Sequence, residues 1–368
     1  MKIANVVGTR PEIIKMQAVI KEIQRRKHEL VLIHTNQHYD YNMSNIFIDE
    51  LGLPRPSYFL NVKSGSQGVQ TGKIIARCEK ILEIIKPDIV LVVGDTNSGL
   101  GAAIASSKLP LPFAHVEAGC RSFDKFMPEE INRVVISDIA DLNFAATDNC
   151  VNNLLMEGIA TSRIYLTGHP IVDLMHEIKN KLSEKSPDGL EFASKQYGLI
   201  TLHRRENVIN EDRIRNILIA CERLSKKVRL LFPCHPHTRK QIKRFALKGH
   251  LGNIKLIAPV PYLQSLNLVK NARFVLTDSG GIQQEAALLG TPCITLREVT
   301  EWIETVNAGV NFLTGTKAED IIWRVNYLES NYDDIVGRFK STQELFGKLG
   351  ASTRITEAIE RTEKDIRF

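Results

Sequence analysis

Residues 272–285 read Ala-Arg-Phe-Val-Leu-Thr-Asp-Ser-Gly-Gly-Ile-Gln-Gln-Glu, an apolar run followed by a glycine turn and a helical pattern. Two adjacent glycines let the backbone approach a phosphate closely, and Ser279 can cap the helix that follows. The first-turn N–H groups of such a helix point at a bound oxyanion. Glu285 lies one turn further on, where a carboxylate suits a sugar hydroxyl better than a phosphate. An ordinary tight strand-to-helix turn has the same pattern, so the prediction of a phosphate site depends on the rest of the chain.

A second turn of this kind follows the apolar run at residues 3–7 and reads Gly8-Thr9-Arg10-Pro11-Glu12. Pro11 is typical of a first helical turn, and Arg10 stands where strand gives way to helix. Arg10 is therefore a candidate bidentate phosphate ligand, with a solvated arginine as the alternative. Lys15, one turn into the helix, would add positive charge there or else be solvated. The turn has no G-x-G-x-x-G pattern, so no bound dinucleotide is expected.

The chain has 368 residues, a length that suits two domains. Its composition, 43% apolar and 24% charged, is ordinary for a globular protein. The net charge of +6 fits an anionic ligand, but no long Lys/Arg run indicates nucleic acid. The six cysteines lack C-x-x-C spacing, as expected of reduced thiols in a cytoplasmic protein. No apolar run reaches about 18 residues, so no membrane span is predicted.

Apolar runs alternate with helix-period segments through most of the chain. Strands are predicted at residues 3–7, 29–34, 88–93, 111–116 and 141–145, and again at 198–202, 228–233, 254–257, 273–277 and 293–296. This alternation predicts an α/β protein with two Rossmann-like, doubly wound parallel-sheet domains, at residues 1–175 and 190–350. Each half carries a ligand-type turn, so we expect the site in an interdomain cleft.

Four chemically selective residues stand at predicted strand ends or helix starts. Asp95 follows the strand at 88–93, Glu117 ends the strand at 111–116, Glu129 opens a helix, and His203 follows the first strand of the second half. Helix capping is the alternative role for such carboxylates, and the preferred one for Asp95 taken alone. Three carboxylates from one domain and a histidine from the other suit acid/base chemistry better than structure.

The combination of motifs resembles the non-hydrolysing UDP-N-acetylglucosamine 2-epimerases over nearly the whole chain. The matching segments, in the order of that family, are Gly8–Glu12, Gly94–Thr96, His115–Gly119, Pro128–Arg133, His203–Glu206 and Asp278–Gln283. The resemblance implies the two-domain arrangement of B-type glycosyltransferases, with a C-terminal helix at about 351–368 packing back on the first domain. A homodimer is also expected.

The family reaction interconverts UDP-GlcNAc and UDP-ManNAc. Elimination of UDP across C1–C2 gives a 2-acetamidoglucal, and UDP then adds back with protonation on the opposite face. By analogy Asp95, Glu117, Glu129 and His203 are the acid/base set, and which carboxylate is the base stays open. The UDP-binding set is Arg10, Lys15, Ser279, Gly280, Gly281 and Glu285. The mechanism implies no cofactor, and neither a nucleic acid nor a membrane is an expected partner.

Two features depart from the family pattern or add to it. Some relatives bind a second UDP-GlcNAc as an activator, and Gln37, Arg204 and His235 would contact it here, although the loop 63–68 has no arginine. The segment Gly168-His169-Pro170-Ile171-Val172-Asp173 differs from the usual Gly-Asn-Thr-x-Ile-Asp. We interpret this segment as the domain junction.

Other functions stay open at this point. The run Cys234-His235-Pro236-His237 has three metal-type donors but no partner pair elsewhere, which favours a polar turn over a metal site, so no metal is predicted. A hydrolysing 2-epimerase would release UDP and free N-acetylmannosamine. A glycosyltransferase would need an acceptor site, and a non-catalytic sugar-nucleotide sensor would need no titrating groups.

Overall fold

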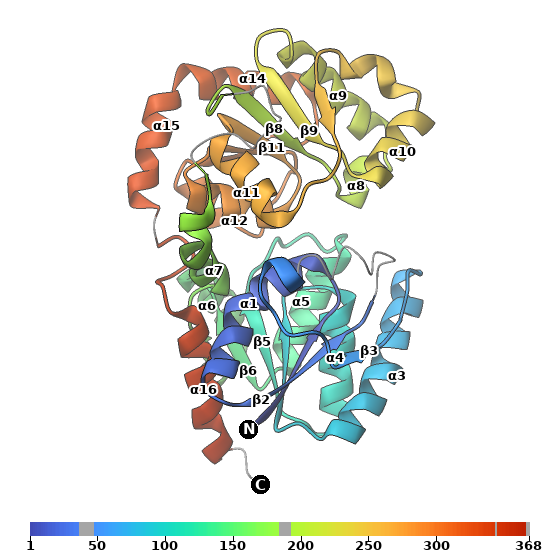
Figure 1. Ribbon diagram of the computed structural model, residues 1–368, viewed down its shortest axis with the longest axis vertical. Coiled ribbons are helices and arrows are strands. Elements are labelled where there is room, and N and C mark those ends of the chain that lie inside the picture. The colour runs from blue at the N-terminus through green and yellow to red at the C-terminus, as the bar shows by residue number, and fades with distance from the viewer. Residues whose placement is uncertain (37–47, 184–192, 343, 366–368) are drawn as a thin grey trace. The chain divides into compact units, whose positions relative to one another are not determined.

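The computed structural model describes residues 1–36, 48–183, 193–342 and 344–365. The chain divides into two compact units. Unit 1 comprises Met1–Glu177 and Phe346–Phe368, and unit 2 comprises Ile178–Leu345. Each unit is an α/β layer structure built on its own parallel sheet (Figure 1).

Unit 1 alternates strands with helices along the chain. Its strands are β1 (Lys2–Val7), β2 (Glu29–His34), β3 (Tyr58–Phe59), β4 (Ile89–Val93), β5 (Phe113–Ala118), β6 (Leu142–Ala145) and β7 (Ile164–Leu166). Its helices are α1 (Arg10–Arg25), α3 (Gln67–Ile85), α4 (Asn97–Lys108), α5 (Pro128–Ile139), α6 (Asp148–Met156), α7 (Pro170–Ile178) and α16 (Ala351–Asp365), with a 3-10 turn at Thr161–Arg163.

The sheet of unit 1 has the order β3-β2-β1-β4-β5-β6-β7 within the described residues, and every pairing is parallel. Strand order reverses between β1 and β4, because the chain first adds strands on one side of β1 and then on the other. In open α/β sheets, ligands bind beyond the carboxyl ends of the strands at this switch point. The turns that follow β1, β4 and β5 therefore lie where a site is expected.

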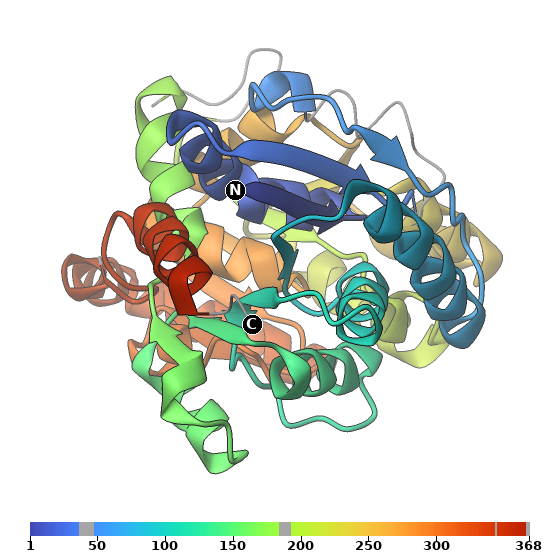
Figure 2. The same ribbon diagram turned by 90° about the horizontal axis from the view of Figure 1, so that it is seen from below.

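Helices cover both faces of this sheet. Buried side chains of α3, α4 and α5, among them Ile74, Ala102 and Ile136, pack on alternate residues of the strands, such as Ala4 and Val90. The other face carries α1 and α16, as the view in Figure 2 shows. Burial on both faces explains why the strands read as continuous apolar runs.

The C-terminal helix α16 is fixed to unit 1 by polar contacts. Arg26, directly after α1, bonds to Glu357 and Glu360 of α16 at 3.0 and 2.7 Å. Asp173 of α7 accepts hydrogen bonds from the N–H groups of Gly350 and Ser352, at 2.6 and 2.8 Å. A carboxylate at a helix N-terminus satisfies N–H groups that have no partner within the helix.

Unit 2 repeats the alternation. Its strands are β8 (Tyr197–Thr201), β9 (Arg229–Pro233), β10 (Lys255–Ile257), β11 (Phe274–Thr277), β12 (Cys293–Thr295) and β13 (Asn311–Leu313). Its α-helices are α8 (Arg205–Val208), α9 (Glu211–Leu224), α10 (Pro236–Arg244), α11 (Tyr262–Asn271), α12 (Gly280–Leu289), α13 (Ile303–Asn307), α14 (Ala318–Ser330) and α15 (Tyr332–Arg338). Short 3-10 turns occur at Lys179–Lys181, Leu247–Leu251 and Phe339–Ser341.

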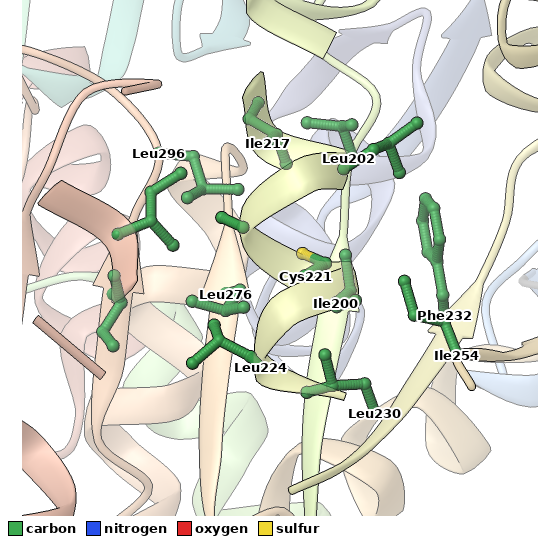
Figure 3. Packing of buried hydrophobic residues seen from close by; sticks show 14 of the residues in the cluster. Ile200, Leu202, Ile217, Cys221, Leu224, Leu230, Phe232, Ile254, Leu276 and Leu296 are labelled. Carbon is green, nitrogen blue, oxygen red and sulfur yellow. The ribbon is translucent and has the colours of Figure 1, made fainter. Parts of the chain in front are cut away.

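The sheet of unit 2 has the order β10-β9-β8-β11-β12-β13 in the part of the chain that the structure describes, again with parallel pairing. Its switch point lies between β8 and β11. On one face, Ile217 and Cys221 of α9 pack against Ile200, Phe232 and Leu276 of the strands (Figure 3). The turns after β8 and β11 thus correspond to those after β1 and β4 in unit 1.

Each predicted strand appears within two residues of its expected bounds. The structure adds β3, β7 and β13, which the sequence did not predict. These strands have two or three residues, lie at sheet edges and are largely half-buried. Their apolar signal is too short to stand out from a loop.

Candidate active site

The β1–α1 turn is closed by a carboxylate of its own helix. Oε2 of Glu12 accepts hydrogen bonds from the N–H groups of Gly8 and Thr9, at 2.9 and 2.7 Å, in a capping box. Its other oxygen accepts one from the Thr96 hydroxyl at 2.7 Å, which ties this turn to the turn after β4. Because these two N–H groups already have a carboxylate partner, the turn does not offer them to a dinucleotide pyrophosphate.

Glu117 lies at the carboxyl end of β5 in a strained conformation. Its φ of 67° is left-handed, and the pairing of β5 with β6 shifts register between Val116 and Ala118. A bulge of this kind re-aims a side chain and is common beside active sites. A left-handed non-glycine residue costs roughly 1–3 kcal/mol, so the surrounding contacts must hold it in place.

Two cationic or donor side chains contact the Glu117 carboxylate. Nζ of Lys15 lies 2.7 Å from Oε1 and 2.6 Å from Oε2, and Nε2 of His169 lies 2.7 Å from Oε2. All three side chains are buried or nearly so. The contacts bring together α1, β5 and the turn before α7.

Burial and these partners determine the charge of the group. Burial alone would raise the pKa of Glu117, but the charge of Lys15 and the hydrogen bond from His169 outweigh it and lower the pKa to about 2. For Lys15, burial opposes the ammonium, whereas the charges of Glu117 and Asp95 favour it, and its pKa is raised. Glu117 is therefore ionised and Lys15 protonated at neutral pH.

Asp95, in the turn after β4, forms an ion pair with Arg133 of α5. The second Arg133 nitrogen bonds to Glu130 at 2.9 Å. Nδ2 of Asn132 donates to the Asp95 carbonyl at 2.8 Å, which holds the turn against α5. Asp95 therefore lies at the same end of the sheet as Glu117, and its side chain is 20% exposed.

Neighbouring Glu129 and Glu130 have different environments. Glu130 is buried and accepts hydrogen bonds from Ser122 and Phe123, so it fixes the loop after β5. Glu129 lies half-buried in the first turn of α5. Arg10 begins α1 at the carboxyl end of β1 and is also half-buried. Gln37 lies outside the described residues.

His203 of unit 2 is oriented by a buried aspartate. Its Nδ1 lies 3.2 Å from Oδ1 of Asp278, and the backbone N–H groups of His203 and Arg204 donate to the same carboxylate. Asp278 is fully buried, whereas the His203 side chain is 51% exposed. Burial opposes the Asp278 charge, but these partners outweigh it and lower its pKa. The exposed ring is held through Nδ1, as a proton-transferring histidine requires.

The glycine turn predicted to bind phosphate follows β11 and opens α12. Ser279 caps the helix by accepting from the Ile282 N–H at 3.4 Å. A Cβ on Gly280 would lie 2.2 Å from Oε1 of Glu301, whereas one on Gly281 would meet only the Ser279 hydroxyl, at 3.9 Å. Gly280 is therefore needed for the close packing of Glu301 against the turn. Glu285, one turn on, is buried.

Two arginines flank Glu301 beside this turn. Arg297 donates to Glu301 Oε2 at 2.8 Å, and Nη2 of Arg204 lies 3.6 Å from Oε1. Arg204, predicted as an activator contact, thus stands beside the α12 N-terminus in unit 2. His235, the other described residue of that set, caps α10 by accepting from the His237 N–H at 3.2 Å.

Two further properties of the described residues bear on function. No group of three histidine, cysteine, aspartate or glutamate side chains is arranged to hold a metal ion among them. None of their helices combines the length and hydropathy that crossing a membrane needs.

Comparison with known proteins identifies the family. A family model described as UDP-N-acetylglucosamine 2-epimerase matches residues 21–360. The chain belongs to the UDP-N-acetylglucosamine 2-epimerase family. It is 47% identical to UDP-N-acetylglucosamine 2-epimerase of Methanococcus maripaludis over 332 residues, covering 87% of this chain and 90% of that protein.

Two other family relatives bear on the ligand. The crystal structure of Methanocaldococcus jannaschii UDP-GlcNAc 2-epimerase in complex with UDP-GlcNAc and UDP is 42% identical, with a TM-score of 0.89, and covers 98% of this chain and 100% of that one. UDP-2,3-diacetamido-2,3-dideoxy-D-glucuronate 2-epimerase of Pseudomonas aeruginosa is 38% identical over 360 residues, covering 97% of this chain and 99% of that protein.

The sequence did not predict every residue that touches the candidate site residues. His169, Asp278 and Glu301 contact Glu117, His203 and the Gly280 turn, yet none was assigned a role. A signal existed for His169, because its segment departs from the family pattern. The sequence interpretation of that segment is a domain junction, whereas its histidine contacts Glu117.

Proposed function

We propose that the protein interconverts UDP-GlcNAc and UDP-ManNAc by elimination of UDP and re-addition, without hydrolysis. The observation that carries the proposal is the ionised Glu117 carboxylate, strained at the end of β5 and held by Lys15 and His169. Family membership and the UDP-GlcNAc complex of the M. jannaschii relative support the substrate.

The proposed roles follow the chemistry of each side chain. Proton removal at C2 needs an acceptor, and Glu117 is ionised at neutral pH. Reprotonation on the opposite sugar face needs a second acid/base group. We assign this role to His203, whose Nδ1 contacts Asp278. Asp95 and Glu129 complete the proposed acid/base set. Acid/base groups on both faces are what an elimination and re-addition with inversion requires.

The diphosphate needs positive charge and N–H donors as it leaves C1. We assign this task to Arg10 and Lys15 of unit 1 and to Ser279, Gly280 and Gly281 at the α12 N-terminus of unit 2. Glu285 is proposed as the ribose ligand.

Lys15 also links substrate binding to the base. A carboxylate with a pKa of about 2 is a weak base, because general bases act best with a pKa near the operating pH. A diphosphate that draws the Lys15 ammonium toward itself would weaken its hold on Glu117 and raise the pKa of that carboxyl. Glu117 would then become a stronger base when substrate is bound.

Product analysis tests this function directly. UDP-GlcNAc should give UDP-ManNAc without added cofactor. ¹H and ³¹P NMR and mass spectrometry identify the products. Stoichiometric free UDP with N-acetylmannosamine would favour a hydrolysing enzyme instead. UDP-2,3-diacetamido-2,3-dideoxy-D-glucuronate should be offered in parallel, since the P. aeruginosa relative is named for it. Turnover of this nucleotide alone would contradict the assigned substrate.

A further inference from the structure

His169 contacts Glu117 although 52 residues separate them in sequence. It lies directly before α7, its side chain is fully buried, and its Nε2 is 2.7 Å from Oε2 of Glu117. The Lys15 contact reaches the same carboxylate from α1. Lys15 is a long, flexible side chain and is 16% exposed, whereas His169 is enclosed.

The hydrogen bonds of the ring determine its tautomer. Nδ1 of His169 accepts a hydrogen bond from the Ile171 N–H at 3.0 Å, so Nδ1 carries no proton. The ring proton is therefore on Nε2, which donates to Glu117. Burial lowers the pKa of His169 although Glu117 opposes this, and the ring is neutral. The first turn of α7 thus sets the donor that faces Glu117.

The backbone of the same residue is anchored as well. The His169 N–H donates to the carbonyl of Phe346 at 2.8 Å, and its ring accepts from the helix that follows. The imidazole is held from two directions, so the position of Nε2 is set by the fold of unit 1. Such a donor remains in place when a mobile cation moves away.

We propose that His169 is a positioning residue for the epimerisation, whose Nε2–H holds the Glu117 carboxylate in its orientation while Lys15 engages the diphosphate. The inference rests on the proposed function, because it gives Glu117 and Lys15 the roles assigned above. It adds a residue for which the sequence suggested only a junction between domains.

Other charged and titratable groups act on the same carboxylate and its partners. These are Lys15 from α1, Asp95 after β4 with its partner Arg133 of α5, His115, Cys120 and Arg121 from the β5 segment, and Asp173 from α7. Exchange of His169 alone leaves all of them in place. A change in the pH profile would therefore report the lost donor rather than a new charge.

Two substitutions of His169 distinguish its role as a helix cap of α7 from its role as a hydrogen-bond donor to Glu117. In His169→Ser, the serine hydroxyl can accept a hydrogen bond from the first turn of α7 as a helix cap, but it is too short to reach Glu117. Asn in His169→Asn is a helix cap that also carries an N–H donor, and it is the residue of the pattern from which this chain departs. His250→Ser is the matched control, because His250 pairs with Glu222 at 2.8 Å in unit 2, among residues with no assigned role in the reaction.

Steady-state kinetics with UDP-GlcNAc should distinguish these variants. We expect His169→Ser to lower kcat on the order of tenfold or more with little change in KM, since a hydrogen bond to a charged group is lost. The acid limb of kcat, which reports groups in the substrate complex, should move up by about one pH unit, because the ionised carboxylate loses a donor. His169→Asn should recover most of both effects, and His250→Ser should show neither. A folded His169→Ser enzyme with wild-type kcat and pH profile would overturn the proposal.

A second measurement needs no substitution at this position. ¹⁵N NMR of the histidine rings in the wild-type protein should show His169 as the neutral Nε2–H tautomer between pH 6 and 9, with an Nε2 proton shift that changes in Glu117→Gln. A protonated ring or the Nδ1–H tautomer at pH 8 would contradict the proposal. This measurement does not depend on turnover. Absence of epimerisation by the wild-type protein would contradict the proposed function, but the His169–Glu117 hydrogen bond could still be tested by NMR.

Discussion

The Lys15 ammonium and the Glu117 carboxylate form an ion pair at 2.6 Å, although the two residues are 102 positions apart. Both side chains are largely buried, at 16% and 5% exposure. Lys15→Met should leave Glu117 as a buried charge without its cation. We expect a loss of about 3–5 kcal/mol in the free energy of unfolding of unit 1, the usual cost of breaking a buried pair.

Denaturant unfolding of a double-mutant cycle checks this expectation. Lys15→Met combined with Glu117→Gln should be more stable than Lys15→Met alone, because the uncompensated charge is removed. Additive losses in the double variant would mean that the two groups do not interact in solution.

The lowered pKa of Glu117 predicts how stability responds to acid. A carboxyl whose folded pKa is about 2 favours the folded state at every pH above its unfolded value near 4.5, and this contribution is lost as pH falls toward 2. The difference in Tm between wild type and Glu117→Gln should therefore be largest above pH 5 and shrink below pH 4. Thermal scans from pH 7 to pH 3 measure it, and a pH-independent difference would contradict the assigned shift.

Acid/base roles predict a separation of binding from turnover. Glu117→Gln and His203→Asn should slow turnover by roughly 10²-fold or more while UDP affinity changes little, since the diphosphate ligands remain. Calorimetric titration with UDP and product assays on the same samples measure both quantities. Parallel loss of affinity and rate in either variant would assign that residue to binding instead.

The two glycines of the α12 turn should respond differently to a methyl group. In Gly280→Ala the new Cβ would meet Glu301, which Arg297 holds in place, so Tm should fall. Gly281→Ala has space in the protein and should keep its Tm, yet lose UDP affinity on the order of tenfold if the phosphate approaches this backbone. Equal changes in Tm and in UDP affinity for the two variants would refute the assignment of this turn to phosphate binding.

Much of the fold could be predicted from local sequence. Residues 89–93 are an unbroken apolar run and form β4, and Asp278–Glu285 form the glycine turn and helix that their order indicated. The alternation of strands with helices along the chain predicted that the strands of each sheet are parallel. Edge strands such as β7 escaped prediction because three half-exposed residues leave no distinct pattern.

The candidate site was predictable only in part, for a physical reason. Strand ends can be predicted from sequence, so Asp95, Glu117 and His203 could be placed at the carboxyl edges of their sheets. The His169 contact depends on the bulge at Glu117 and on how α7 follows β7, which no local pattern encodes. Likewise, Glu301 meets Gly280 only once β11 and the segment after β12 are neighbours.

The isotopic composition of the product tests the proposed mechanism. The β1–α1 turn lacks the dinucleotide fingerprint, and Glu12 occupies two of its N–H groups, so hydride transfer to a nicotinamide is not expected. If UDP is eliminated and then adds back, epimerisation in D₂O should place deuterium at C2 of the product, because the removed proton exchanges with solvent before return. Substrate labelled with ¹⁸O between C1 and phosphorus should also scramble the label whenever the β-phosphate rotates before re-addition. Retention of hydrogen at C2, with turnover that depends on added NAD, would replace elimination by transient oxidation and remove Glu117 from its role as the C2 base.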